Sequence, residues 1–194
     1  MKRFTFITAA TVAGFCMAGS ALVADSYEID PTHAWVGFKT NHAGWAKAHG
    51  SFKAVSGTIS FDKDDVTKSS VKIILEAASV DTNDEKRNTH LKSPDFFNAE
   101  EFPQITFEST AIEKTGEKTA KVTGDLTMVG TTKPVVLDVT WNSDSPLPWD
   151  ANTIKTGFSA SGSLKGTDFG IAKMTDFGIG PDIAIDIDLE AVKK

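Results

Sequence analysis

Cysteine is almost missing from this sequence of 194 residues, and tyrosine occurs only once. The one cysteine, Cys16, lies in an N-terminal segment that we expect to be removed, so no disulfide is expected in the mature chain. The fold must therefore depend on a hydrophobic core, which about 170 residues are enough to bury. An oxidising compartment is compatible with this composition but is not required by it.

Positive charge is also scarce. The chain carries 20 Lys and Arg residues against 26 Asp and Glu residues, which gives a net charge of −6. No segment gathers the basic residues into a stripe, so nucleic acid is excluded as an expected partner. Glycine-rich phosphate-binding motifs are absent, and no apolar run after the N-terminal segment is long enough to span a bilayer. We therefore expect a soluble mature protein.

The few histidines do not have the spacing of a metal site. They are His33, His42, His49 and His90. Metal sites usually contain closer pairs, such as His-x-His, or His-Glu-x-x-His on a helix. The sequence therefore predicts no bound metal ion and no catalytic cofactor.

Candidate catalytic groups are equally weak. Asp81 and His90 could act as a base and the residue that orients it, but no nucleophile accompanies them. Asp168 and Asp176 could form a carboxylate pair for glycoside cleavage, but both lie in a glycine-rich loop. We expect Asp81 and His90 to hold a helical insertion in place, and we predict no catalytic residues.

The first 24 residues have the features of a secretory signal peptide. Lys2 and Arg3 precede an uncharged stretch over residues 4–23, and the small residue Ala24 suits cleavage. The alternative is a membrane anchor, but threonine and serine interrupt the stretch and no basic cluster follows it. We expect export to the periplasm and a mature domain over residues 25–194. Its 18 basic and 26 acidic residues then give a net charge of −8.

The mature chain alternates apolar and polar residues in short segments separated by turn residues, which indicates β-strands. Eight such segments are expected, over residues 34–42, 50–61, 71–77, 105–109, 122–128, 135–141, 158–164 and 183–190. The second segment is expected to bend at Gly57. Eight strands with one apolar face each can close into an antiparallel barrel, whose interior holds side chains or one small ligand. On the pattern alone, a packed sandwich without a cavity is an equal alternative.

One stretch between the third and fourth segments breaks the alternation. Thr82 stands three residues before Glu85, which is the order of a capping box, so a short helix is expected to run to about Leu91. Ser93 and the proline after it are expected to begin a second helical turn. This insertion, over about residues 83–98, would cover one end of the barrel.

Five groups of segments together resemble the YceI-like polyisoprenoid-binding family. They are Tyr27–His33 with Phe38, His42 and Gly50–Phe52; Ser79–Thr82 with Arg87, His90–Ser93 and Asp95–Asn98; Phe102–Ser109; Gly124–Val135; and Asp168–Gly170. The matches run in order from Tyr27 almost to the C-terminus. The second and third groups are the most specific.

The resemblance implies an all-β fold, namely a single antiparallel eight-stranded lipocalin-like barrel with a short helical insertion. It also implies an apolar lumen that binds a polyisoprenoid chain, for example the tail of an isoprenoid quinone, in a periplasmic and non-catalytic protein. Transient contact with a membrane or membrane protein and a homodimer, which some members form, are further expectations. One position departs from the family, which often has Arg two residues before Asp-Phe-Gly. Here that position is Gly166, beside Lys165.

Mostly apolar side chains fall on the expected inner faces of the strands. The residues expected to line the lumen and contact the ligand are Phe38, His42, Phe61, Ile73, Leu75, Phe107, Leu126, Leu137 and Ile185. Burial contributes about 0.8 kcal/mol for each CH₂ group, so one five-carbon isoprene unit gains roughly 4 kcal/mol. Two other functions stay open. One is an enzyme for a small apolar substrate, with His42 as the titratable group in the lumen, and the other is a stress-response interaction protein with a filled core.

Overall fold

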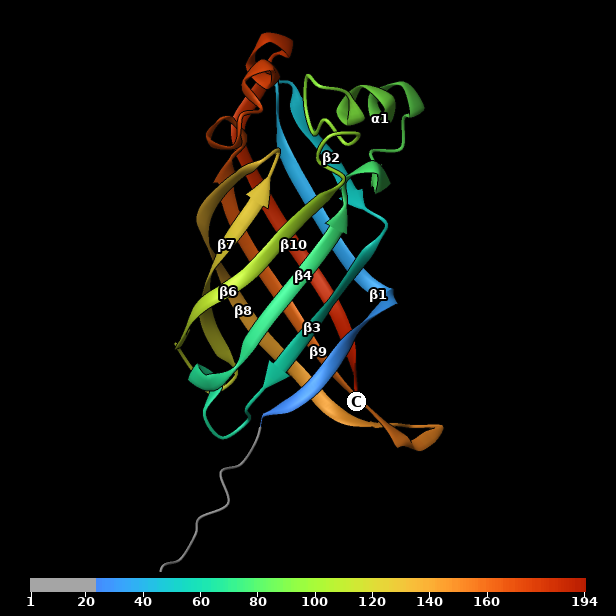
Figure 1. Ribbon diagram of the computed structural model, residues 1–194, viewed down its shortest axis with the longest axis vertical. Helices are drawn as coiled ribbons and strands as arrows, with labels where there is room; N and C mark the ends of the chain where they lie inside the picture. The colour runs from blue at the N-terminus through green and yellow to red at the C-terminus, as the bar shows by residue number, and fades with distance from the viewer. Residues whose placement is uncertain (1–23) are drawn as a thin grey trace, which may run out of the picture.

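The computed structural model describes residues 24–194 as an elongated β structure (Figure 1). The expected signal peptide therefore lies, except for its last residue, outside the described residues. The strands are β1 (Asp25–His42), β2 (Ala46–Phe52), β3 (Val55–Phe61), β4 (Ser70–Glu76), β5 (Val80–Asp81), β6 (Gln104–Lys114), β7 (Thr119–Met128), β8 (Thr131–Leu147), β9 (Asp150–Lys165) and β10 (Ile179–Lys193). The helical elements are α1 (Glu85–Lys92) and the 3₁₀ helices η1 (Val66–Lys68), η2 (Ala77–Ser79), η3 (Gly166–Phe169) and η4 (Ala172–Phe177).

Eight of the strands close into an antiparallel barrel in the order β1-β3-β4-β6-β7-β8-β9-β10, and β10 pairs with β1 to complete it. The expected eight-stranded barrel is confirmed, and the alternative of a packed sandwich is wrong. The two remaining strands lie at one end: β2 pairs with the second half of β1, and the short β5 pairs with β2. Closure pairs each of the eight barrel strands on both sides, and the remaining sheet edge lies at β2 and β5.

β1 bends sharply where it changes its pairing partner. Residues 25–28 pair with β3, and the pairing with β10 is interrupted between Ile29 and Ala34. Pro31 lies inside this interruption, and proline has no N–H to donate to a neighbouring strand. The segment Asp30–His33 consequently bulges from the sheet, and Asp30, Thr32 and His33 bond to one another instead.

The expected second strand, residues 50–61, is broken at Lys53–Ala54, and the bend expected at Gly57 is wrong. The N–H groups of Lys53 and Ala54 donate to the backbone oxygen and side-chain hydroxyl of Ser79 instead of to a neighbouring strand. Gly57 has a different role within β3. A Cβ atom there would lie 2.1 Å from the carbonyl oxygen of Lys72, so only glycine allows β3 and β4 to approach this closely.

The helical insertion forms, but it begins later than its sequence suggests. Asp84, and not Thr82, caps α1: its carboxylate accepts a hydrogen bond from the Arg87 N–H. The Thr82 hydroxyl is used elsewhere because it donates to Asn88 and accepts from the Arg87 side chain. The second helical turn expected from Ser93 is a non-helical turn, since Phe97 N–H returns to the carbonyl of Leu91.

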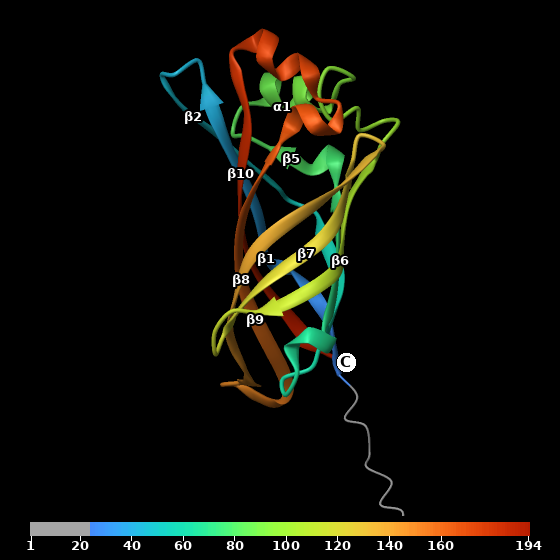
Figure 2. The same ribbon diagram turned by 90° about the vertical axis from the view of Figure 1, so that its left-hand side faces the viewer.

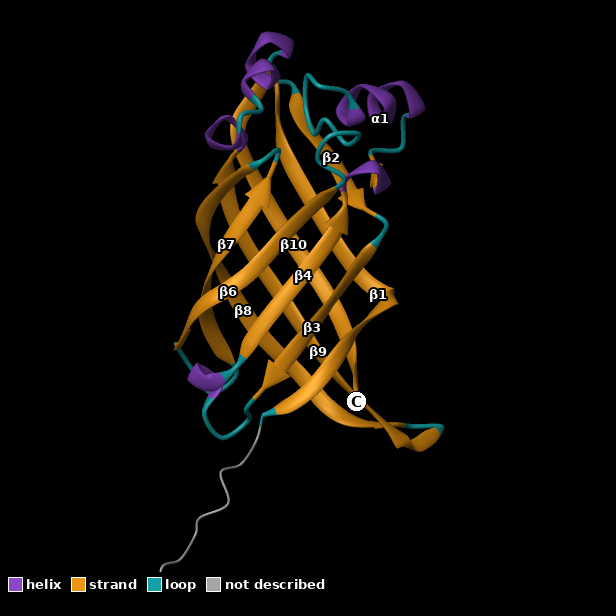
Figure 3. Cartoon of the chain, viewed as in Figure 1, coloured by secondary structure: helices purple, strands orange, loops and turns teal. Residues whose placement is uncertain are grey.

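Nearly all the helical structure lies at one end of the barrel, which we call the upper end after its position in Figure 1. α1 and the η3–η4 segment meet across this end, as the turned view shows (Figure 2). Of the helical elements in the described residues, only η1 lies at the lower end, within the β3–β4 connection (Figure 3). In residues 24–194 no helix is long and apolar enough to cross a membrane.

Candidate functional site

The upper half of the barrel contains an apolar cavity of about 140 Å³. We call it the upper chamber. Its wall includes Val36, Phe38, Phe52, Leu75, Ile105, Leu126, Met128, Leu164, Ile183 and Ile185. One water molecule needs roughly 10–15 Å³ of such space, so the chamber could hold several. Because apolar cavities tend to stay dry, the chamber is better suited to an apolar ligand.

Two segments from different parts of the chain cap the upper chamber. The α1 insertion contributes Leu91, Phe96 and Phe97 to its lining, and the η3–η4 segment contributes Ile171 and Met174. Phe97 packs edge to face against Phe52 of the wall, with ring centroids 5.4 Å apart. The upper end is thus covered by side chains that continue the hydrophobic wall.

The two caps are joined at their outer edge by a small cluster, the cap clasp, formed by His90, Asp95, Phe96, Lys173 and Phe177. Lys173 forms an ion pair with Asp95, and His90 Nε2 lies 3.1 Å from the same carboxylate. The His90 ring also stacks edge to face on Phe96 and Phe177, at 5.0 and 4.9 Å between centroids. The Lys173 hydrogen bond holds the pKa of the Asp95 carboxyl below its usual range. The clasp therefore ties two segments about eighty residues apart.

Three polar side chains that line the upper chamber, those of Thr40, Thr82 and Arg87, are engaged with protein partners. The Thr40 hydroxyl donates to the carbonyl oxygens of Gly180 and Asp182. Arg87 donates through Nε to the Thr82 hydroxyl and through Nη2 to the Thr82 carbonyl oxygen. In residues 24–194 no buried side-chain nitrogen or oxygen lacks a hydrogen-bond partner. The chamber therefore has no buried polar group that awaits a ligand.

A second apolar cavity, of about 120 Å³, lies below the first, and we call it the lower chamber. Its wall includes Ile59, Phe61, Ile73, Phe107, Val122, Leu137, Val139, Trp141, Phe158, Ile187 and Leu189. The rings of Trp141 and Phe158 both pack on Phe61, at 5.2 and 5.3 Å between centroids. The lower chamber is lined at one side by more polar residues of the β3–β4 and β6–β7 connections, including Ser69, Lys114 and Lys118.

The two chambers have no lining residue in common. Phe107 and Leu126 are direct partners on β6 and β7, yet Phe107 lines only the lower chamber and Leu126 only the upper. The Phe107 ring lies over Gly124: a Cβ atom at position 124 would come within 2.4 Å of the ring. The lumen of this structure is therefore divided at the level of these residues.

Eight of the nine residues expected to line the lumen do so. Phe38, Leu75, Leu126 and Ile185 line the upper chamber, and Phe61, Ile73, Phe107 and Leu137 line the lower one. The expected position of His42 is wrong. β1 and β10 lose register between Thr40 and His42, so His42 lies beyond the barrel end, exposed, with its ring 5.7 Å from that of Trp45. The titratable group that the enzyme hypothesis placed in the lumen, His42, therefore lines neither chamber.

Several lining residues were not among those expected from the sequence, and they include Leu91, Trp141, Phe158, Ile171 and Met174. Trp141 and Phe158 belong to expected strands, on the same faces as Leu137 and Leu164, because side chains on one face of a strand recur every second residue. Ile171 and Met174 carry a weaker signal, since they are apolar residues in a loop rich in glycine and aspartate.

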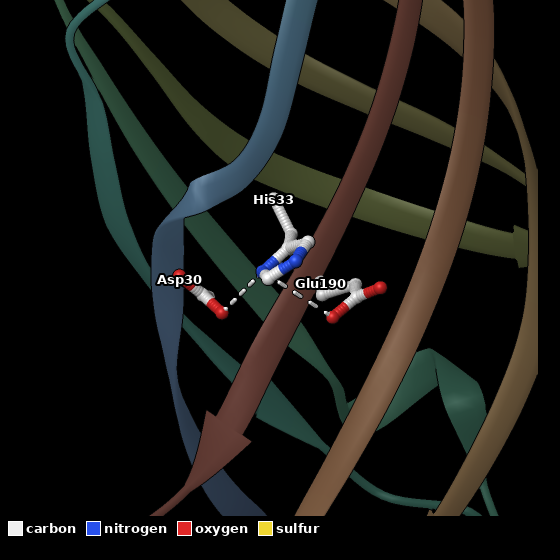
Figure 4. A group of neighbouring side chains, drawn as sticks. All are labelled: Asp30, His33 and Glu190. Carbon is white, nitrogen blue, oxygen red and sulfur yellow. Dashed lines mark hydrogen bonds and ion pairs between the residues drawn. The ribbon is translucent and has the colours of Figure 1, made fainter.

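A polar cluster on the β1 bulge contains residue types that can bind a metal ion. Asp30, His33 and Glu190 each offer a ligand atom, and these atoms lie within 4.8 Å of one another (Figure 4). However, the Lys155 ammonium already lies among them, 2.6 Å from Asp30 and 2.7 Å from Glu190. Burial raises the pKa of Asp30, but hydrogen bonds from Lys155, Thr32 and His33 outweigh it and hold that pKa well below its usual range. The lysine thus supplies the positive charge that a metal ion would bring.

A third pocket, of about 360 Å³, adjoins this cluster and is lined by His33, Lys155, Glu190 and a mixture of polar and apolar residues of the β8–β9 hairpin. Asn142 in its wall donates to the Ser159 hydroxyl, and Ser159 donates to Asp188. Its polar groups thus pair with one another, and it lacks the continuous apolar wall of the two chambers. The chambers inside the barrel are the better candidate site.

An antiparallel eight-stranded barrel that encloses an apolar, capped lumen defines a lipocalin-like protein. The particular family is shown by the sequence: the chain belongs to the YceI-like family, whose domain model matches residues 27–191. It is 42% identical over 182 residues to a UPF0312 protein of Pseudomonas savastanoi, with 91% of each chain covered. A UPF0312 protein of Serratia proteamaculans is 40% identical over 196 residues, with 100% of this chain and 99% of the relative covered.

Solved structures share the fold. The Campylobacter jejuni YceI protein superposes with a TM-score of 0.70 at 28% identity and covers 100% of this chain and 99% of its own. Burkholderia cenocepacia BcnA gives a TM-score of 0.73 at 23% identity, with 84% and 98% covered. A polyisoprenoid-binding domain of Saccharophagus degradans, implicated in plant cell wall breakdown, gives 0.66 at 16% identity, with 89% and 99% covered. The resemblance to the YceI-like family and the expected barrel are thereby confirmed.

Proposed function

We propose that this protein binds a long apolar isoprenoid lipid, such as a polyisoprenoid or the tail of an isoprenoid quinone, inside the barrel without acting on it chemically. The observation that carries this proposal is the pair of apolar chambers, which follow one another along the barrel between a capped upper end and a more polar lower end. The Saccharophagus relative, described as a polyisoprenoid-binding domain, supports the same ligand class. A filled core, the alternative considered from sequence, does not account for the two chambers.

The energetics favour a chain-like apolar ligand. Each CH₂ group moved from water into the chambers contributes about 0.8 kcal/mol, so each isoprene unit contributes roughly 4 kcal/mol. Immobilising a flexible group costs on the order of 1 kcal/mol, so several units give a net gain. No charged partner in the chambers is needed for this binding. Affinity is therefore expected to depend on how well the length and shape of the tail match the lumen.

We also propose that the protein works after export, in the periplasm. The support is the sequence of residues 1–24, where two basic residues precede an uncharged stretch and small residues. The intact mass of protein purified from the periplasm of a Gram-negative host should show a chain that begins between Ser20 and Tyr27. Periplasmic protein that keeps Met1 would contradict cleavage.

Lipid binding is tested by what the purified protein contains and by what stabilises it. Extraction with organic solvent, followed by mass spectrometry, should release an isoprenoid lipid. Delipidated protein should melt at a higher temperature when ubiquinone homologues are added, because a ligand that binds only the folded state stabilises it. Fully unfolded and refolded protein serves as the lipid-free starting material. If extraction yields no lipid and no homologue shifts the melting temperature, the proposed function is wrong.

A further inference from the structure

We propose that Phe107 is the residue that makes binding depend on tail length, because it forms the boundary between the two chambers together with Leu126. This inference rests on the proposed lipid binding and adds a specificity-determining residue to it. A short tail occupies one chamber and leaves the boundary in place. A longer tail has to pass between Phe107 and Leu126 into the other chamber.

The boundary consists of side chains alone. On β4 it falls between Ile73 below and Leu75 above, and on β10 it falls between Ile187 below and Ile185 above. On β6 it lies between Ile105 above and Phe107 below. These are consecutive inward-facing positions on each strand, since side chains on one face recur every second residue. The chambers are therefore adjacent, and moving side chains is enough to join them.

Phe107 is the largest of the side chains that face the boundary from β4, β6, β7 and β10, and its contacts show why it can move. It pairs with Ile73 on one side and with Leu126 on the other. Its ring lies against the backbone of Gly124, where no side chain competes for the space. Gly124 has no side chain, so nothing at position 124 blocks a rotation of the Phe107 ring about its side-chain bonds.

Moving the Phe107 ring costs free energy, and only a tail long enough to reach the boundary requires this movement. Holding a side chain away from its preferred rotamer costs about 0.5–1.5 kcal/mol, which is roughly a factor of two to ten in affinity. In the unaltered protein, affinity should therefore rise with each added isoprene unit, but by less for the unit that first reaches the boundary. We call this smaller gain the step. A smaller residue at position 107 removes the step.

The test compares Phe107→Leu and Phe107→Ala with the unaltered protein and with Phe102→Leu. The Phe102 ring also lies against the backbone of a glycine, Gly130, but Phe102 lines neither chamber, so its substitution is the matched control. Affinities for geraniol, farnesol, geranylgeraniol and solanesol are measured by displacement of a fluorescent lipid. Circular dichroism first verifies that each variant folds, and Phe107→Leu keeps the test available if Phe107→Ala does not fold.

The ratio of solanesol affinity to farnesol affinity should rise by roughly two- to tenfold in the Phe107 variants and stay unchanged in Phe102→Leu. An unchanged ratio in a folded Phe107 variant overturns the boundary role and leaves lipid binding intact. An equal rise in Phe102→Leu also overturns it, because a loss of bulk outside the chambers would then suffice. If none of the four alcohols binds the unaltered protein, the proposed function fails and the boundary role fails with it.

Discussion

The hydroxyl of Tyr27 donates a 2.6 Å hydrogen bond to the carboxylate of Asp144, a residue 117 positions away in the chain. Tyr27 is fully buried, and Lys63 donates to the other oxygen of the same carboxylate at 2.7 Å. The bond therefore ties the start of β1 to β8, while Lys63 adds the β3–β4 connection. Burial and the hydrogen bond to Asp144 both raise the pKa of Tyr27 well above its usual range.

The Tyr27→Phe variant should lose this tie without losing the chambers, because Tyr27 lines neither of them. A hydrogen bond to a charged group contributes about 1.5–3 kcal/mol, so the free energy of unfolding should fall by about that amount. Urea unfolding of both proteins measures the difference. Lipid affinity is the control, and a large change in affinity would contradict a purely structural role for Tyr27.

The polar cluster on the β1 bulge, in which Lys155 lies between Asp30 and Glu190, should make the stability of the protein depend on pH in the acid range. The pKa of Asp30 is lowered in the folded protein, so its contribution is complete above the unfolded pKa of about 3.9 and is lost as the pH falls below it. Lys155→Met should therefore destabilise the protein at pH 7, by about 1–3 kcal/mol for this partly buried pair, and by less at pH 3. Urea unfolding at the two pH values measures both differences.

Lys121→Met is the matched control for this experiment. Lys121 also pairs with a carboxylate, that of Asp138 at 2.7 Å, but both side chains are about half exposed or more. Solvent screens such a pair, so its removal should change stability little at either pH. If Lys121→Met and Lys155→Met change the free energy of unfolding by the same amount at both pH values, the cluster on the β1 bulge contributes no more to stability than an exposed ion pair.

Leu126 offers a test of the upper chamber. Leu126→Arg would bring a cation into an apolar cavity, where an unpaired charge is strongly unfavourable, so lipid binding should be abolished. Leu126→Phe shortens the chamber without adding charge and should shift binding toward shorter tails, with a loss of stability of about 1–3 kcal/mol from overpacking. Thermal unfolding with ubiquinone homologues of different tail lengths distinguishes the two variants. Equal ligand-induced shifts in both would show that the lipid does not enter this chamber.

The cap clasp should control how fast lipid is exchanged at the upper end. Lys173→Gln removes the ion pair with Asp95 but leaves the chamber lining unaltered. We expect release of a bound fluorescent lipid to accelerate a few-fold with little change in affinity, since the weakened contact is exposed. Lys68→Gln, which breaks an exposed pair with Asp65 away from the clasp, is the control. Unchanged release in Lys173→Gln would place the route of exchange at the lower end.

Local patterns predicted the strands well and the details at their ends poorly. Alternation assigned inward positions such as Phe107 and Leu137 correctly, because successive side chains of a strand point to opposite faces. The start of α1 was missed because Thr82 has the right chemistry for a cap, but its hydroxyl bonds to Asn88 and Arg87 in the folded protein. The break at Lys53–Ala54 depends on Ser79, a residue 25 positions away from Ala54. His42 continues the alternation of β1, yet the barrel ends before it.

The sequence by itself determined that this chain forms antiparallel strands with one apolar face each, and its motifs identified the family. Those properties depend on the order of neighbouring residues, which alternation and short motifs record. The closure of the barrel, the clasp between Asp95 and Lys173, and the division of the lumen at Phe107 and Leu126 were decided only by the tertiary structure. They depend on the strand register and on the directions in which distant side chains meet, such as the ring of Phe107 over the bare backbone of Gly124.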